Sequence, residues 1–262
     1  MNILQILISM SKIAFITGAT SGIGLETARQ LSENGFNLII TGRRNDRLLK
    51  LKSEIELKSG VKVLALCFDV RNQVEVVKAV ASLPNEWKEI DVLLNNAGLA
   101  SGLNTVQDGD VEDWEKMIDT NIKGLLYISR EIAPLMIARK IGHIVNISSI
   151  AGHEVYEKGN VYCATKHAVE ALSKGMRLDL LKHNIKVTSI APGMAETEFS
   201  VVRFHGNTEA AQNVYKGFVP LSAADIADAI LYAVTRPAHV CINEMLIMPT
   251  AQANATNVNK VF

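Results

Sequence analysis

Residues 12–24 read KIAFITGATSGIG and place a glycine-rich loop directly between an apolar run and a helix-forming segment. Glycines at positions 18, 22 and 24 let a backbone approach a pyrophosphate, and the free N–H groups and positive end of the following helix attract its charge. A strand, a glycine loop and a helix in this order indicate a dinucleotide site. The spacing is GxxxGxG rather than GxGxxG, so a tight turn that binds nothing is the alternative.

Beyond this unit, apolar runs and helical patterns alternate along the whole chain. Runs rich in Ile, Val and Leu lie at 12–17, 37–41, 61–68, 90–95, 142–148, 185–190 and 241–248. Helical patterns lie between them at 23–34, 44–58, 72–82, 111–139, 160–182 and 223–235. Continuous apolar runs are typical of strands covered on both faces, and their interleaving with helices indicates βαβ units. The prediction is an α/β, Rossmann-type, doubly wound parallel sheet of about seven strands with helices on both faces.

The chain contains no Pro- or Ser-rich linker and no repeat, so residues 10–262 are predicted to form one domain. Two segments, 194–222 and 249–262, interrupt the alternation. Ligands of open α/β sheets bind outside the carboxyl ends of the strands, so the long segment 194–222 is expected to act as a lid. Residues 1–9 are apolar, but they are too short to span a bilayer and lack the charged start of a signal peptide. They are given no function.

The composition excludes several kinds of partner. The chain has 262 residues, equal numbers of basic and acidic side chains (27 each) and 48% hydrophobic residues. Without a basic excess to neutralise phosphates, no nucleic acid is expected, and no membrane association is expected either. Cys67, Cys163 and Cys241 show no CxxC spacing, so we expect no disulfide framework and no metal site, and a cytoplasmic location fits best.

The choice of cofactor depends on Thr41-Gly42-Arg43-Arg44, about twenty residues past the glycine loop. An NAD-binding chain places an acid there for the ribose 2′-hydroxyl, and this chain has none. Arg43 and Arg44 can instead bind a 2′-phosphate with their guanidinium groups, which predicts NADP. The alternative is that one or both arginines are solvated charges at a helix start. Asp46 is expected to be an ordinary acid of the first helical turn.

A candidate reaction centre lies in the second half of the chain. Tyr162 and Lys166 are four residues apart in a predicted helix, so both side chains project from one face. An ammonium beside a phenol lowers its pKa from about 10 and makes it a usable acid or base. Ser149 follows a predicted strand, at the sheet edge where ligands gather, and its hydroxyl can hold the reacting oxygen. A packed ring and a solvated amine are the alternative, which the presence of Ser149 and the glycine loop disfavours.

Together these motifs resemble the short-chain dehydrogenase/reductase family over about residues 12–248. Further matching motifs are Asp69-Val70, Asn95-Asn-Ala-Gly98, Asn121, and Pro192-Gly193 followed by Thr197. The resemblance implies four catalytic residues, Asn121, Ser149, Tyr162 and Lys166, with Asn121 supporting a water-linked proton relay to Lys166. The full cofactor-binding set is expected to be Gly18, Thr20, Ser21, Gly22, Ile23, Gly24, Arg43, Arg44, Asp69, Val70, Asn96, Ala97, Gly98, Tyr162, Lys166, Pro192, Gly193 and Thr197.

Within the family, the chain looks most like the NADP-dependent 3-hydroxy acid dehydrogenases, which oxidise serine, allo-threonine and related acids. The likeness is carried by residues 41–44, 111–121, 159–162, 197–204 and 237–240. It implies that hydride leaves the carbinol carbon of a 3-hydroxy acid for NADP while Tyr162 removes the hydroxyl proton. Departures at 195–196 and 153–156 lie near the expected pocket and put the preferred substrate in doubt.

Two other functions stay open at this point. One is reduction of another carbonyl compound, such as a 3-oxoacyl thioester, a sugar or a xenobiotic, on the same scaffold. The other is a non-enzymatic NADP sensor, which the complete set of four catalytic residues disfavours.

The substrate contacts are expected to be Ser149, Tyr162 and Arg203, with Arg203 offering a guanidinium fork to the carboxylate. Alternatively, Arg203 is exposed or paired with an acid such as Glu198. The tail 249–262, with Gln252, is a further candidate for folding over the pocket. The family resemblance also implies a homotetramer, formed through helices 111–139 and 160–182.

Overall fold

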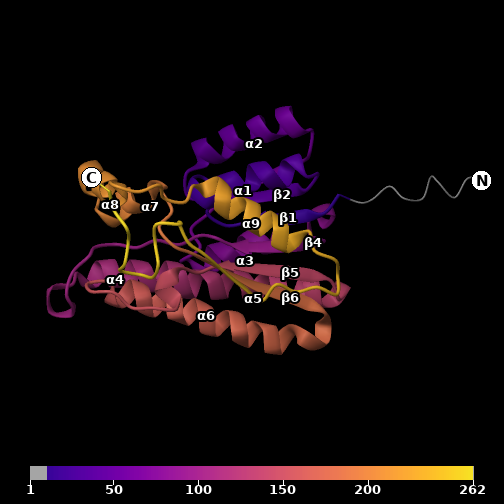
Figure 1. Ribbon diagram of the computed structural model, residues 1–262. Coiled ribbons are helices and arrows are strands. Elements are labelled where there is room, and N and C mark those ends of the chain that lie inside the picture. Colours follow the sequence, from indigo (N-terminus) through magenta and orange to yellow (C-terminus); the bar gives the residue numbers. More distant parts are fainter. Residues whose placement is uncertain (1–10, 262) are drawn as a thin grey trace, which may run out of the picture.

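The computed structural model describes residues 11–261, and its centre is a seven-stranded sheet in which neighbouring strands are parallel (Figure 1). The strands are β1 (Ile13–Ile16), β2 (Asn37–Gly42), β3 (Val63–Cys67), β4 (Ile90–Asn95), β5 (Gly142–Ile147), β6 (Ile185–Pro192) and β7 (Glu244–Ile247). Their order is β3-β2-β1-β4-β5-β6-β7. The order of strands reverses direction between β1 and β4, and a crevice for a ligand forms at such a point. The predicted Rossmann-type fold is confirmed.

Helices cover both faces of the sheet and divide the core in two. One face packs against α1 (Gly22–Glu33), α2 (Asn45–Ser59) and α9 (Ala223–Val234). The other packs against α3 (Gln73–Ala81), α5 (Leu125–Arg139) and α6 (Asn160–Leu180). The side chains of β1 alternate accordingly, since Ala14 and Ile16 belong to the first core and Ile13 and Phe15 to the second. Both faces of this strand are therefore apolar, which is why the strand reads as a continuous run in the sequence.

The segment predicted as one helix over 111–139 is divided. It consists of α4 (Val111–Ile118), a π-helical turn (Asp119–Gly124) and α5. Such turns insert an extra residue into a helix and are frequent at functional sites. Here the turn contains Asn121, which is 2% exposed. Apolar periodicity carries no signal for a local change of helical pitch, so the sequence showed one uninterrupted pattern.

The other differences between the predicted and the observed elements concern the ends of strands and helices and several short turns and helices. Strand β6 runs two residues further than predicted, to Pro192, whereas β1, β3 and β7 are shorter than predicted, and α6 is followed by a 3₁₀ turn at Leu181–His183. Segment 194–222 contains two helices, α7 (Glu198–Arg203) and α8 (Thr208–Tyr215). The remaining 3₁₀ turns are Asn85–Trp87, Val106–Asp108 and Ile150–Gly152. The extension expected at 1–9 lies outside the described residues. Within 11–261, no helix has both the length and the apolar character needed to cross a membrane.

Candidate active site

A cavity of about 640 Å³ lies along the carboxyl ends of the strands, on the side where β1 and β4 diverge. The predicted residues that line it are Gly18, Thr20, Ser21, Gly22, Ile23, Arg43, Arg44, Asp69, Val70, Asn96, Ala97, Gly98, Ser149, Tyr162, Lys166, Pro192, Gly193, Thr197 and Arg203. Two of the predicted residues, Gly24 and Asn121, do not line it. This cavity thus brings together residues from most of the length of the predicted domain.

The glycine loop has the conformation that a phosphate cradle needs. Gly18 has φ +67°, a left-handed conformation that side chains disfavour. Gly24 lies behind the loop, where an added Cβ would meet the Gly18 carbonyl oxygen at 2.5 Å, so it permits close packing instead of contacting a ligand. Helix α1 starts without a side-chain cap from Ser21 and without an acid in its first turn, so its N–H groups and positive end remain available to an anion. These features fit a pyrophosphate.

Asn96 holds this loop from the neighbouring strand end. Its side-chain amide donates hydrogen bonds to the carbonyl oxygens of Thr17 (2.9 Å) and Gly18 (3.1 Å). The Thr17 hydroxyl in turn accepts from the backbone N–H groups of Asn96 and Ala97, both at 3.0 Å. The glycine loop and the end of β4 are therefore tied into one rigid wall of the cavity.

Arg44, predicted to bind a 2′-phosphate, lines the cavity beside the glycine loop and already has partners. Its Nε and Nη2 donate to the Thr20 hydroxyl (3.1 and 2.9 Å), and Nη2 also donates to the Ser21 hydroxyl (2.9 Å). Its Nη1 donates to Glu198 Oε2 at 2.9 Å. Arg43 is more exposed, with Nη1 at 3.9 Å from Asp69 Oδ2. Two cations therefore line this part of the cavity, and each lies near one acid: Arg44 near Glu198 and Arg43 near Asp69.

Glu198 connects this wall to segment 194–222. It begins helix α7 and accepts hydrogen bonds from Arg44 and, at 2.6 Å, from Arg47. Burial raises the pKa of the Glu198 carboxyl, but the hydrogen bonds from Arg47 and Arg44 outweigh it, so the pKa is lowered and the group is charged at neutral pH. The role of Arg47 was not predicted, because its partner lies some 150 residues away in the sequence.

Three of the four predicted catalytic residues, Ser149, Tyr162 and Lys166, line the other end of the cavity. Tyr162 and Lys166 share one face of α6, and the Lys166 ammonium is 5.9 Å from the centre of the Tyr162 ring. Lys166 Nζ donates to the Ile147 carbonyl at the end of β5 (2.8 Å), and burial lowers its pKa to about 8. Ser149 follows β5, and its hydroxyl accepts from the Ala151 N–H at 3.1 Å.

Asn121 acts from behind the cavity wall. Its side chain accepts from the Leu99 N–H (2.9 Å) and donates to the Leu99 carbonyl (2.8 Å) and to the Thr165 hydroxyl (3.0 Å). The hydrogen bond to Thr165 thereby fixes the π-helical turn against α6 at the residue before Lys166. A Cβ added to Gly98 would lie 3.2 Å from Asn121 Oδ1 and 3.5 Å from Lys166 Nζ, so the glycine leaves these two groups room.

The pKa of Tyr162 is shifted in the opposite direction from the one expected. Burial raises it above the ordinary value for a phenol, and neighbouring Tyr156 raises it further, whereas Ser149 and Arg203 act the other way. The expectation that Lys166 would set a lowered pKa was therefore wrong for this arrangement, because complete burial penalises the phenolate more than the nearby groups stabilise it. Tyr162 is protonated at neutral pH and can donate a hydrogen bond or a proton.

Arg203 lies beside the phenol of Tyr162. The alternative prediction, that Arg203 pairs with Glu198, was wrong. Arg203 Nη2 donates to the Tyr156 hydroxyl (2.9 Å), and its guanidinium lies 5.4 and 5.7 Å from the ring centres of Tyr156 and Tyr162. Phe199 packs edge-on against Tyr162 at 5.6 Å between ring centres. Sequence reasoning assigned no role to Tyr156 or Phe199, although Tyr156 lies in the loop before Tyr162 that departs from the family pattern. This end of the cavity thus combines aromatic walls with the cationic side chains of Arg203 and Lys166.

The tail folds over its own cavity. Gln252 is 5% exposed, and its Oε1 accepts from the Met194 N–H at 2.8 Å. Lys260 donates to the Val214 carbonyl of α8 at 3.1 Å. Residues of α7, α8 and the tail thus line the cavity together with the strand ends.

Comparisons with known proteins agree with this geometry. A family model described as short chain dehydrogenase matches residues 12–207. The chain is 48% identical to an NADP-dependent 3-hydroxy acid dehydrogenase of Salmonella typhimurium, covering 93% of this chain and 97% of that protein. It is 44% identical to serine 3-dehydrogenase of Agrobacterium fabrum, covering 94% and 97%. A closed serine dehydrogenase complexed with NADP⁺ superimposes with a TM-score of 0.89 at 45% identity, covering 93% and 97%. The chain belongs to the short-chain dehydrogenase family.

Proposed function

We propose that this chain is an NADP-dependent oxidoreductase that transfers hydride between NADP and a small 3-hydroxy acid of the serine, allo-threonine or 3-hydroxypropionate type. The observation that carries the proposal is one cavity with Arg43 and Arg44 at one end and Tyr162, Lys166 and Arg203 at the other. The names of the relatives support the same cofactor and substrate class. Turnover of serine with formation of NADPH, followed by its absorbance, tests the proposal directly.

Four side chains and the bound cofactor would each have a separate role in the reaction. The hydride acceptor would be the nicotinamide of bound NADP. Ser149 holds the reacting oxygen by a hydrogen bond. In the oxidative direction the phenolate form of Tyr162 takes the hydroxyl proton as the C–H hydride leaves, and in the reductive direction the phenol returns that proton. Lys166 places a cation near the phenol, and Asn121 braces the helix that carries both. Loss of a hydride from carbon and a proton from oxygen converts the 3-hydroxy acid to a 3-oxo acid, an aldehyde from serine and a ketone from allo-threonine.

Another carbonyl reductase activity remains the second candidate. The aromatic walls formed by Tyr156, Phe199 and Tyr162 would also accept a larger apolar substrate. A panel of hydroxy acids, sugars and uncharged alcohols separates the two functions, since a preference for acids requires a cation in the pocket.

Arg203 is expected to be that cation. Replacing it with Ala should raise the KM for serine by about tenfold or more, because a charge-assisted hydrogen bond to a carboxylate contributes about 1.5–3 kcal/mol. The KM for an uncharged secondary alcohol should change little. Arg203→Lys, which keeps the charge, is the matched control and should retain part of the preference. Equal losses on both kinds of substrate would mean that Arg203 shapes the pocket and that the carboxylate is held elsewhere.

Arg43 and Arg44 are expected to determine cofactor preference. Replacing both with Ala should raise the KM for NADP by about 10- to 100-fold and leave the KM for NAD nearly unchanged, because only NADP carries the extra phosphate. Arg47→Ala is the control, since it removes a cation that also pairs with Glu198 but does not line the cavity. A wild-type preference for NAD would contradict the argument from the missing acid.

We also propose that residues 10–262 act as one domain in the cytoplasm, with 194–222 as a lid. The Arg44–Glu198 ion pair supports the lid, because it joins the cofactor end of the cavity to the first turn of α7. Binding of a 2′-phosphate to Arg44 would compete with Glu198 and so couple the cofactor to this segment.

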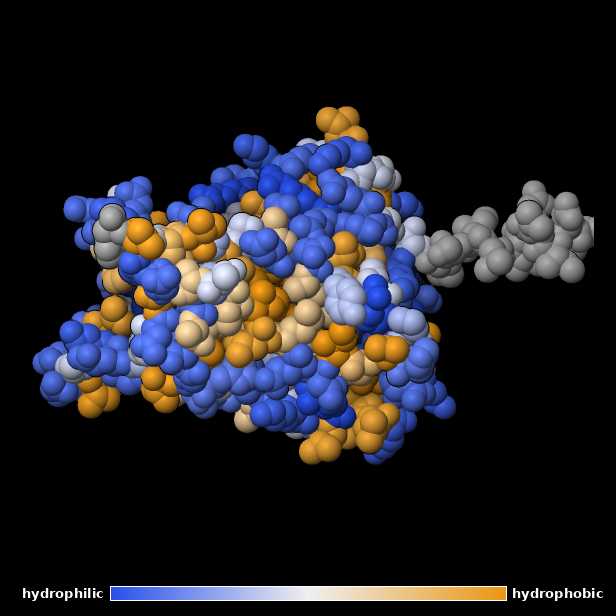
Figure 2. Space-filling model, viewed as in Figure 1, coloured by the Kyte–Doolittle hydropathy of each residue, from blue (hydrophilic) through white to orange (hydrophobic). Residues whose placement is uncertain are grey.

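A homotetramer is proposed as the assembly. Helices α5 and α6 expose Leu126 and Leu178, and α9 and β7 expose Tyr232 and Leu246. Figure 2 shows apolar residues across the middle of the viewed face, over the region where Figure 1 draws α9 and the C-terminal strand. Two apolar surfaces of this kind suit two sets of two-fold contacts. Light scattering at micromolar concentration should give four times the 28.6 kDa chain mass, and a monomer would contradict it.

A further inference from the structure

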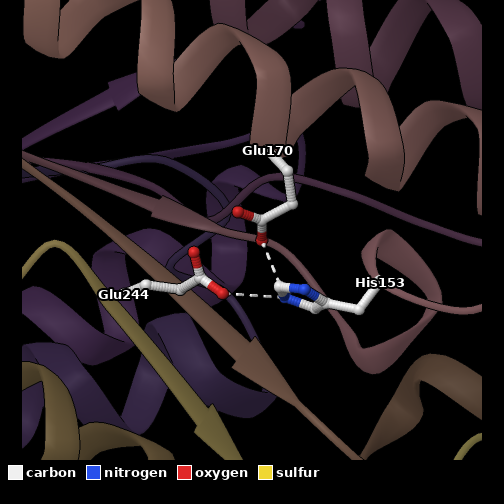
Figure 3. A group of neighbouring side chains, drawn as sticks. All are labelled: His153, Glu170 and Glu244. Carbon is white, nitrogen blue, oxygen red and sulfur yellow. Dashed lines mark ion pairs between the residues drawn. The ribbon is translucent and has the colours of Figure 1, made fainter.

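Three side chains outside the cavity converge on one point (Figure 3). His153 lies just after the 3₁₀ turn that follows Ser149, Glu170 lies on α6 one turn beyond Lys166, and Glu244 is the first residue of β7. Each offers one ligand atom, and these atoms all lie within 4.8 Å of one another. Imidazole and carboxylate are ligand types that zinc binds in proteins.

The spacing suits a shared ion better than direct hydrogen bonds. His153 Nε2 is 3.4 Å from Glu170 Oε1 and 3.5 Å from Glu244 Oε1. Hydrogen bonds from N–H to O are shorter, at about 2.7–3.2 Å. Two ligands that each lie about 2.0–2.1 Å from a tetrahedral ion are themselves about 3.3–3.4 Å apart. His153 Nε2 therefore already lies at ligand-to-ligand spacing from both carboxylates, and the three ligand atoms lie within 4.8 Å of one another.

Glu170 supplies an independent indication. Its side chain is 6% exposed, and its Oε1 accepts a hydrogen bond from the Ser189 hydroxyl at 2.7 Å. Its Oε2 and His153 Nε2 are buried atoms without a hydrogen-bond partner among the described residues. A buried carboxylate oxygen without a partner is costly, and a second carboxylate nearby adds repulsion. A cation between the two carboxylates would remove the repulsion, and an ion that Glu170 binds through both of its oxygens would also satisfy Oε2.

We propose that His153, Glu170 and Glu244 form a site for a tetrahedral divalent cation, best matched by Zn²⁺, with the fourth position open to water. His153 and Glu244 are partly exposed, at 24% and 38% of their side chains, which gives an ion a route in. Mg²⁺ and Ca²⁺ fit less well, because they prefer six or more oxygen ligands. The cysteine pattern indicated no metal site, and these three ligands come from segments far apart in the sequence.

The bound ion would act as a structural clamp. It would join the turn after Ser149 to the helix that carries Tyr162 and Lys166, and both to the edge strand β7. The ligands themselves do not line the active-site cavity. The expected effect is therefore on stability and on the order of the turn, and not on the chemical step.

The test uses the full-length chain without an affinity tag, stripped with a chelator and then titrated with ZnCl₂. Elemental analysis after desalting should find about one zinc per chain. The melting temperature should rise by about 5 °C when zinc is present at a hundredfold excess over its Kd, and Mg²⁺ at the same concentration should not raise it. Co²⁺ at the same site should give the visible absorption bands of tetrahedral cobalt.

His153→Ala and Glu244→Gln should each abolish the stoichiometric zinc and the gain in melting temperature. Both residues are partly exposed, so the variants should fold. His239→Ala removes an exposed histidine elsewhere and is the matched control, which should behave as wild type. No zinc bound by the wild-type chain, or equal binding by the two ligand variants, would overturn the proposal. In the first case the three side chains would simply pack together without an ion.

Discussion

Tyr162→Phe is expected to lower kcat by about 10²–10⁴-fold, the range that a positioned general acid or base contributes. The variant keeps the ring that packs edge-on against Phe199 and lies below the Arg203 guanidinium, and it removes only the oxygen that exchanges the proton. Steady-state oxidation of serine, followed by NADPH absorbance, measures the loss.

The same variant should bind the cofactor nearly as well as wild type and melt at nearly the same temperature, because the buried ring remains in place and only its hydroxyl is deleted. Titration of NADPH fluorescence and a melting curve serve as these controls. A variant that keeps a tenth or more of the wild-type kcat would remove Tyr162 from the proposed proton transfer.

Lys166→Met is expected to have the second largest effect. The unbranched Met side chain fills a similar volume but loses the ammonium, its hydrogen bond to the Ile147 carbonyl and its charge beside the Tyr162 ring. We expect kcat to fall by about 10²-fold or more and the KM for NADP to rise, because Lys166 is proposed to serve both the phenol and the cofactor ribose.

The pH profile distinguishes this role from a structural one. Burial lowers the pKa of Lys166 to about 8, so the ammonium is charged below that pH and loses its proton above it. The kcat/KM profile of the wild-type enzyme should contain a step near pH 8 that Lys166→Met lacks. Lys166→Arg, which keeps the charge over this range, is the control. Unchanged kinetics in Lys166→Met would contradict the proposal.

The fold was predictable because its signals are local and repeated. The central strands are buried on both faces and the intervening helices have periodic apolar faces, so residues within a few positions of one another carry the pattern. The glycine loop was recognisable for the same reason, since Gly18 and its neighbours adopt their conformation within one turn. The π-helical turn around Asn121 escaped prediction because it changes the backbone without changing the apolar pattern.

The family resemblance supplied cavity residues from the whole chain, but helix and strand geometry alone predicted the site only where its residues are close in sequence. Tyr162 and Lys166 are one helical turn apart, so their shared face followed from helix geometry. Arg203 was placed near the pocket by its segment, but its partner is Tyr156 and not the nearby acid Glu198. Glu198 instead pairs with Arg44, from the opposite end of the chain.

The sequence by itself thus determined the order of strands and helices, the glycine cradle and the spacing of the reactive phenol and ammonium. Tertiary structure alone decided which charges meet, how deeply Tyr162 is buried, and that His153, Glu170 and Glu244 share one point. The reason is physical. The apolar periodicity of a sequence indicates which face of a helix or strand is buried. Ion pairs, desolvation and the spacing of ligands depend instead on distances between elements, and those distances exist only in the packed chain.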